Sequence, residues 1–63
     1  GAWDHIAMNV RDIDKVYEAV KAAGYTFAEG EDGPVYLPYY ANGVKFFTII
    51  GPNNEKLEFN QIL

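Results

Sequence analysis

Alternating side chains predict β-strands near both ends of the chain. The first stretch, Trp3 to Val10, separates one set of hydrophobic positions from a mixed set; the hydrophobic set is Ile6, Met8 and Val10, and the mixed set is Trp3, His5, Ala7 and Asn9. The second stretch, Lys56 to Ile62, separates Leu57 and Phe59 from Lys56, Glu58, Asn60 and Ile62. Because alternate residues of a strand point to opposite sides of a sheet, the Ile6 set and the Leu57 set are expected to face a helix.

Helical spacing replaces this alternation after Arg11. Hydrophobic residues then recur every three or four positions, at Ile13, Val16, Tyr17, Val20 and Ala23. Asp12 can cap the N-terminus, Asp14 carries a charge that the helix dipole favours there, and Gly24 can end the helix. The pattern therefore predicts a helix that begins after Asp12 and ends before Gly24.

The middle of the chain predicts shorter elements. Tyr25 to Ala28 can form a short strand, and Glu29 to Pro34 contains two glycines and three acidic residues, which indicates an exposed loop. Val35 to Tyr40 is apolar and aromatic, but Pro38 lacks a backbone N–H group. We therefore expect this segment to be an edge strand or an ordered loop.

The last third of the chain predicts a β-hairpin. Lys45 to Ile50 is a strand with large side chains on both faces, and Gly51 to Asn54 has the composition of a turn. Lys56 to Ile62 then returns beside it. Since both faces of the Lys45 strand require cover, the sheet is expected to be buried on two sides.

These elements predict an α+β fold with the order βαβββ, in one domain over residues 1–63. Its mixed sheet has a single helix, which covers one face. We interpret Tyr17, Phe46, Phe47 and Phe59 as core residues. A second copy is expected to cover the other face and to form an eight-stranded cleft or barrel, so that aspartate at whichever of Phe47 and Ile49 faces the partner should disrupt pairing.

Composition narrows the classes of function. Five basic and nine acidic residues give a net charge of −4, which is the wrong sign for a surface that holds nucleic acid. No apolar run approaches the roughly 20 residues of a membrane span, so we expect a cytoplasmic protein without a membrane partner. The 63 residues include no cysteine, so a metal or a second chain is the expected source of extra stability.

His5 and Glu58 are the candidate metal ligands. The alternation places His5 on the first strand and Glu58 on the last strand, both on the side away from the helix. One chain thus offers an imidazole and a carboxylate, and a symmetric dimer would bring two of each together as a mixed nitrogen and oxygen site. The alternative is that His5 is an ordinary hydrogen-bonded side chain and that Glu58 is an exposed acidic residue.

Several residues are candidates for a substrate pocket. Three tyrosines gather near Pro38 and could form its wall, although an aromatic cluster beside a proline also suits simple packing. On the side away from the helix, the two outer strands could contribute a tryptophan and an asparagine. The candidate set is Trp3, Tyr36, Tyr39, Tyr40 and Asn60.

Two stretches carry a resemblance to a known family. "DHIAMNVRDIDKVYEAVKAAGY" and "GVKFFTIIGPNNEKLEFNQ" resemble the βαβββ module of the vicinal oxygen chelate superfamily, which includes glyoxalase I, extradiol dioxygenases and the fosfomycin and bleomycin resistance proteins. "FFTIIGPNNEKLEFNQ" is most similar to the C-terminal module of bacterial glyoxalase-like proteins. Family members carry two modules in one chain or pair modules between chains, so the resemblance implies self-association of this chain.

The resemblance also implies a site and a reaction. In metal-using members the first and last strands each give one ligand, and these positions match His5 and Glu58. The implied cofactor is a divalent ion, Zn, Ni, Co, Mn or Fe, and the implied catalytic residue is Glu58, which would move a proton as in a lyase or isomerase. Arg11 is the sole arginine, which argues against glutathione as substrate, and two copies of His5 are too few histidines for an extradiol dioxygenase.

Three functions therefore remain open at the level of sequence. The first is a glyoxalase-like half-domain that self-associates around a divalent metal site. The second is a metal-free module of the bleomycin-resistance type that binds a small, aromatic ligand. The third is an isolated half-domain without activity.

Overall fold

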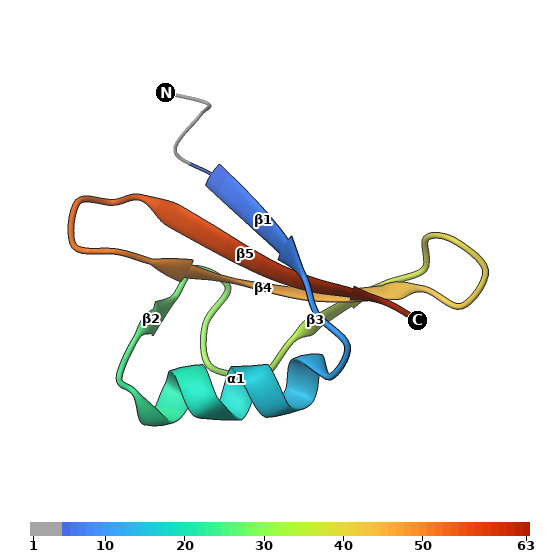
Figure 1. The fold of residues 1–63 in the computed structure, drawn as a ribbon, viewed down its shortest axis with the longest axis horizontal. Helices are drawn as coiled ribbons and strands as arrows, with labels where there is room; N and C mark the ends of the chain where they lie inside the picture. Colours follow the sequence, from blue (N-terminus) through green and yellow to red (C-terminus); the bar gives the residue numbers. More distant parts are fainter. Residues whose placement is uncertain (1–4) are drawn as a thin grey trace.

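The computed structural model describes residues 5–63, with side chains from residue 6 onward, and confirms the α+β class. Along the chain, the elements are β1 (His5–Asn9), α1 (Ile13–Ala22), β2 (Thr26–Phe27), β3 (Val35–Leu37), β4 (Val44–Ile50) and β5 (Lys56–Ile62). In Figure 1 the helix lies on one side of the sheet, and none of the elements in residues 5–63 covers the other side. None of the helical structure in residues 5–63 has the length and apolar character needed to span a bilayer.

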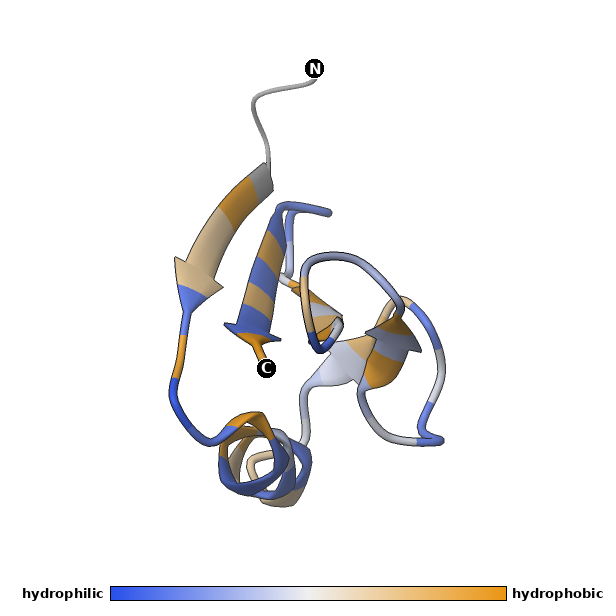
Figure 2. Ribbon diagram, turned by 90° about the vertical axis from the view of Figure 1, so that its right-hand side faces the viewer, coloured by the Kyte–Doolittle hydropathy of each residue, from blue (hydrophilic) through white to orange (hydrophobic). Residues whose placement is uncertain are grey.

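The sheet joins the two ends of the described chain. Its order is β1-β5-β4-β2, with β3 also paired to β4. β1 runs parallel to β5, and β4 and β5 form the predicted antiparallel hairpin. Figure 2 shows β5 with alternating hydrophilic and hydrophobic bands, as its period of two requires. The mixed sheet and its hairpin are therefore confirmed.

β2 and β3 occupy the same edge of β4. β5 pairs along one edge, while Phe27 pairs with Ile49 and Val35 pairs with Phe46 on the other. Together they take the place of one strand, which preserves the βαβββ order. The loop between them bends toward the helix, where the Gly33 N–H donates a hydrogen bond to the Tyr17 hydroxyl at 3.1 Å.

Glu29 supplies a hydrogen-bond acceptor to β4 at the point where β2 has ended and β3 has not begun. Its Oε1 accepts a hydrogen bond from the Thr48 N–H at 2.8 Å, in a partly buried position where no strand residue is available. A side-chain carboxylate thus replaces a backbone carbonyl in the sheet ladder, which satisfies a donor that would otherwise be costly to bury.

Glu29→Ala is expected to destabilise the domain because it leaves the Thr48 N–H without this acceptor. The expected loss of unfolding free energy is about 1–3 kcal/mol. Glu29→Gln keeps a carbonyl oxygen and should lose less than half as much. Urea unfolding followed by far-ultraviolet circular dichroism measures both variants, and equal losses would show that the charge, and not the hydrogen bond, matters.

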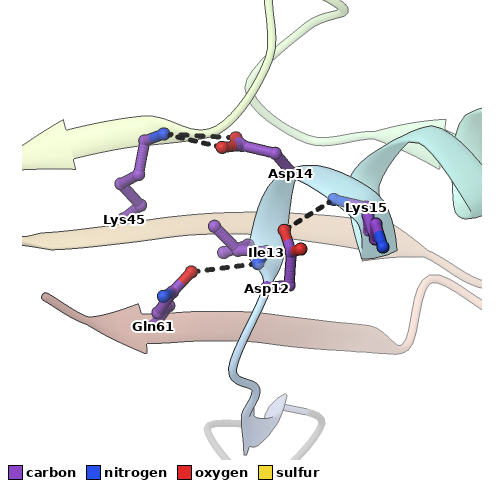
Figure 3. Close-up of polar contacts among 6 residues, drawn as sticks. All are labelled: Asp12, Ile13, Asp14, Lys15, Lys45 and Gln61. Atoms are coloured by element: carbon purple, nitrogen blue, oxygen red, sulfur yellow. Dashed lines mark hydrogen bonds and ion pairs between the residues drawn. The ribbon is translucent and has the colours of Figure 1, made fainter.

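The helix begins where the sequence predicts. Asp12 Oδ1 accepts a hydrogen bond from the Lys15 N–H at 3.3 Å, and Gln61 Oε1 on β5 accepts one from the Ile13 N–H at 3.0 Å (Figure 3). Two of the donors left free at a helix N-terminus are therefore satisfied, one locally and one by the sheet. The Gln61 contact ties the helix to the last strand.

The same helix end carries an exposed ion pair. Lys45 Nζ lies 3.2 and 3.1 Å from the two carboxylate oxygens of Asp14 (Figure 3). Asp14 remains largely exposed, so this pair contributes little stability. At the other end Gly24 has φ +86°, and its N–H donates to Lys21 O at 3.0 Å, which ends the helix as predicted.

An aromatic core lies between the helix and β4. Phe47 is 1% exposed and has ring centroids 5.1–5.6 Å from Tyr17, Phe27 and Phe59. Tyr17 stacks on Phe27 at 4.5 Å. Ile13 and Ile49 complete the buried cluster. The predicted core residues Tyr17, Phe47 and Phe59 thus pack together or against the cluster.

Two predictions about β4 are wrong. Phe46 does not belong to this core, since it lies on the opposite face and is only partly buried. Phe47 and Ile49 both face the helix, so neither lies on the uncovered face, and aspartate at these positions would test folding and not pairing. Both errors have one cause: β4 carries large apolar side chains on both faces, Phe46 and Ile50 on one and Phe47 and Ile49 on the other, so hydrophobicity could not identify the helix side.

The helix covers less of the sheet than predicted. Ile6 and Met8 pair with Leu57 and Phe59 and therefore share their face, as expected. They are nevertheless 64% and 47% exposed. A helix of ten residues covers the two central strands and leaves the side chains of this edge strand uncovered.

Candidate functional site

The face away from the helix is built by β4 and β5. The register pairs Glu58 with Thr48 and Asn60 with Phe46, so these side chains share that face. Thr48 is only 6% exposed, whereas Glu58 and Asn60 are partly buried. On this face, the Glu58 and Asn60 side chains of β5 therefore lie next to the Phe46 ring of β4.

A hollow of about 350 Å³ occupies one end of this face. Glu58 and Asn60 provide its polar side. Its remaining walls are apolar or aromatic and come from β3, the following turn and the hairpin: Leu37, Tyr39, Tyr40, Val44, Phe46 and Ile62. An apolar recess with a few convergent polar groups is the usual form of a small-molecule site.

The polar side is organised by a chain of hydrogen bonds. Asn9 Nδ2 donates to Asn60 Oδ1 at 3.2 Å, and Asn60 Nδ2 donates to Glu58 Oε2 at 3.1 Å. The Asn60 amide is therefore held at both ends, and it orients the carboxylate of Glu58. Asn9 was not predicted as a site residue, although its position in the alternation of β1 places it on this face.

The predicted metal ligands lie on neighbouring strands. His5 pairs with Lys56, and Ala7 pairs with Glu58, so the backbone register assigns position 5 to the same face as Glu58, two residues away. The side chain of His5 lies outside the described part of the molecule. Among the described residues, no three His, Cys, Asp or Glu side chains are grouped so that they could hold a metal ion.

The five predicted pocket residues fall into three groups. Tyr39, Tyr40 and Asn60 line the hollow. Tyr36 does not, because its ring lies against Gly43. Trp3 lies outside the described residues.

The prediction missed four residues that line the hollow. Leu37, Val44, Phe46 and Ile62 are all hydrophobic, and three of them lie on alternate positions of the hairpin that face away from the helix. The alternation alone would have found these three once Phe47 had been assigned to the core. Leu37 had no such signal, since its segment was ambiguous in sequence.

A second hollow of about 370 Å³ lies beside the exposed part of β1. Its walls include Ile6, Leu57 and Ile49, together with residues of the turn that joins the hairpin. This hollow exists because the ten-residue helix does not extend over β1 and so leaves Ile6 uncovered.

Comparison with known proteins supports the fold. The crystal structure of TioX from Micromonospora sp. ML1 has a TM-score of 0.74 and 17% sequence identity to this chain. The match covers 95% of this chain and 43% of the TioX chain, so the chain spans less than half the length of that protein. No protein-family model matches the chain. No curated protein matches it at a significant level. At 17% identity this likeness supports the α+β fold alone.

Proposed function

We propose that this chain is one module of a small-molecule-binding protein and that a second copy closes its binding cleft. The observation that carries the proposal is the hollow on the uncovered sheet face, with its apolar walls and the oriented pair of Glu58 and Asn60. In a single module the rim of the hollow is exposed to solvent, since Tyr39 is 59% exposed and Ile62 is 49% exposed. A second sheet placed over this face would bury these side chains and enclose the ligand.

Two matched isoleucine variants test this pairing. Ile62 and Ile6 are both exposed, but they lie on opposite faces of the sheet. Ile62→Asp is expected to shift the dimer toward monomer by at least about tenfold in dissociation constant, since it would bury an unpaired charge at the interface. Ile6→Asp should leave the constant unchanged. Sedimentation equilibrium measures both, and the opposite pattern would place the partner on the helix side.

A second candidate function is a metal-dependent lyase or isomerase formed by two modules. The register that assigns position 5 and Glu58 to one face favours it. Two modules would supply two imidazoles and two carboxylates, which suits a divalent ion with open positions. Such an ion would polarise substrate oxygens, and a Glu58 carboxylate could accept a proton from the substrate.

Native mass spectrometry separates the two candidates. The wild-type chain, His5→Ala and Glu58→Gln are compared with and without added zinc or nickel. A dimer that binds one metal ion in the wild type and loses it in both variants would favour the metal enzyme. A dimer whose mass is independent of metal would favour the binding module.

A further inference from the structure

The turn between β3 and β4 ends in an asparagine followed by a glycine, Asn42 and Gly43. In Figure 1 this turn extends beyond the end of the sheet. Asn42 is exposed, and within residues 5–63 its side-chain amide makes no hydrogen bond. Nothing in the described part of the chain therefore holds this amide away from the backbone of the next residue.

The fold requires glycine at position 43. Gly43 has φ +92°, which other residues rarely adopt, and a Cβ atom there would overlap the ring of Tyr36. The same absence of a side chain leaves the Gly43 nitrogen sterically open to the side chain that precedes it. Because no bulkier residue fits this position, the fold retains an asparagine beside an unhindered backbone nitrogen.

The Gly43 nitrogen can act as a nucleophile in this turn. Its N–H donates no hydrogen bond to any residue between 5 and 63, whereas the Gly43 carbonyl accepts one from the Leu63 N–H at 2.9 Å. Gly43 is buried, but its reaction with Asn42 is intramolecular and needs no access by an outside nucleophile. The leaving group departs from Asn42, which is exposed.

We propose that Asn42 is a site of spontaneous deamidation in the folded protein. The Gly43 nitrogen loses its proton to a base in the solvent and bonds to Asn42 Cγ, while the Cγ–Nδ2 bond breaks and Nδ2 takes up a proton and leaves as ammonia. Water then opens the cyclic imide. Cleavage between the nitrogen and Cγ gives aspartate, and cleavage between the nitrogen and the backbone carbonyl carbon of residue 42 gives isoaspartate. Either product carries a new carboxylate, which is ionised at neutral pH.

The two products differ in their effect on the sheet. Aspartate adds only a charge at an exposed position. Isoaspartate carries the backbone through Cγ and so lengthens the chain by one carbon directly before Gly43, whose carbonyl pairs with Leu63. The next residue, Val44, already pairs with both β3 and β5. The added atom is therefore expected to loosen this end of the sheet, where Tyr40 and Val44 line the hollow.

Peptide mapping tests the proposed site. The folded protein is incubated at neutral pH and physiological temperature, and trypsin then separates Asn42 from the other turn asparagines because Lys45 lies between them. Asn53 and Asn54 are the internal controls, since they are also exposed but precede residues with side chains. Asn42 is expected to react at least about tenfold faster than either control. Mass spectrometry with electron-transfer fragmentation identifies both products.

Equal rates at the three asparagines would overturn the proposal. Reaction of Asn42 only in protein that is unfolded in urea would also overturn it, because the folded turn would then protect the amide. Neither the reaction nor its test involves a ligand or a second copy, so failure here would leave the proposed function intact.

Asn42→Asp separates the new charge from the added backbone atom. The variant carries the same charge as the deamidated protein on a normal backbone, so its Leu63 amide should exchange with solvent at the wild-type rate. The isoaspartate form, isolated by chromatography, should exchange this amide at least about tenfold faster, because the pairing of Leu63 with Gly43 opens more often. Nuclear magnetic resonance measures both rates. Equal exchange in the two forms would contradict the expected loosening of the sheet.

Discussion

Phe47→Ala is expected to lower the free energy of unfolding by about 3–5 kcal/mol, the largest effect of any substitution considered for this molecule. Phe47 is 1% exposed and contacts three other aromatic rings. Its removal would leave a cavity at the point where the helix, β2 and β5 meet. Small domains are only marginally stable, so the variant is expected to be largely unfolded at room temperature.

Phe46→Ala provides the matched control. The two phenylalanines are adjacent in the chain, but Phe46 lies on the opposite face and lines the open hollow. Phe46→Ala should lower the free energy of unfolding by less than half as much as Phe47→Ala, because the Phe46 ring already faces the open hollow. Near-ultraviolet circular dichroism and thermal unfolding measure both variants. Similar losses for the two would contradict the assignment of the faces.

Gly43→Ala has the second largest expected effect, a loss of about 2–4 kcal/mol in the free energy of unfolding. Two costs combine at this position. Gly43 has φ +92°, which is unfavourable for alanine, and an added Cβ atom would overlap the ring of Tyr36. The Gly43 carbonyl also accepts a hydrogen bond from the Leu63 N–H at 2.9 Å, which restricts any movement of the backbone that would relieve the overlap.

Gly30→Ala separates the two costs. Gly30 also has φ +92°, but an added Cβ atom there would meet nothing within 4 Å. Gly30→Ala should therefore lower the free energy of unfolding only by the cost of the backbone conformation, about 1–2 kcal/mol. Adding Tyr36→Ala to Gly43→Ala should recover part of the difference. Chemical denaturation of these variants gives the values, and equal losses at the two glycines would show that the ring moves aside freely.

Local patterns were sufficient to predict the regular elements. β5 was predicted with its observed bounds because its side chains alternate between large apolar and polar groups. The helix was predicted because Asp12 and Gly24 mark its ends. Its attachment through Gln61 could not be predicted, since that contact joins residues 48 positions apart.

The candidate site was harder to predict because its residues come from separate segments of the chain, residues 37–46 and 58–62. Tyr39 and Tyr40 line the same hollow as Glu58 because β3 and β5 both pair with β4. The positive φ angle of Tyr40, +62°, has no signal in the residues around it. The exposure of Ile6 was also unforeseen, because alternation reveals the face of a strand but not the width of the helix that covers it.

The parallel pairing of β1 with β5 also governs the order in which this fold can form. Asn9 pairs with Asn60, so β1 must wait for β5, which is translated about 50 residues later. The hairpin of β4 and β5 requires only a short loop to close, whereas closing the loop between Asn9 and Asn60 costs more chain entropy. We expect nucleation in the hairpin with α1 docking on it, and β1 adding late as an extended segment. Until then, the N-terminal segment is exposed to proteases and to pairing with other chains.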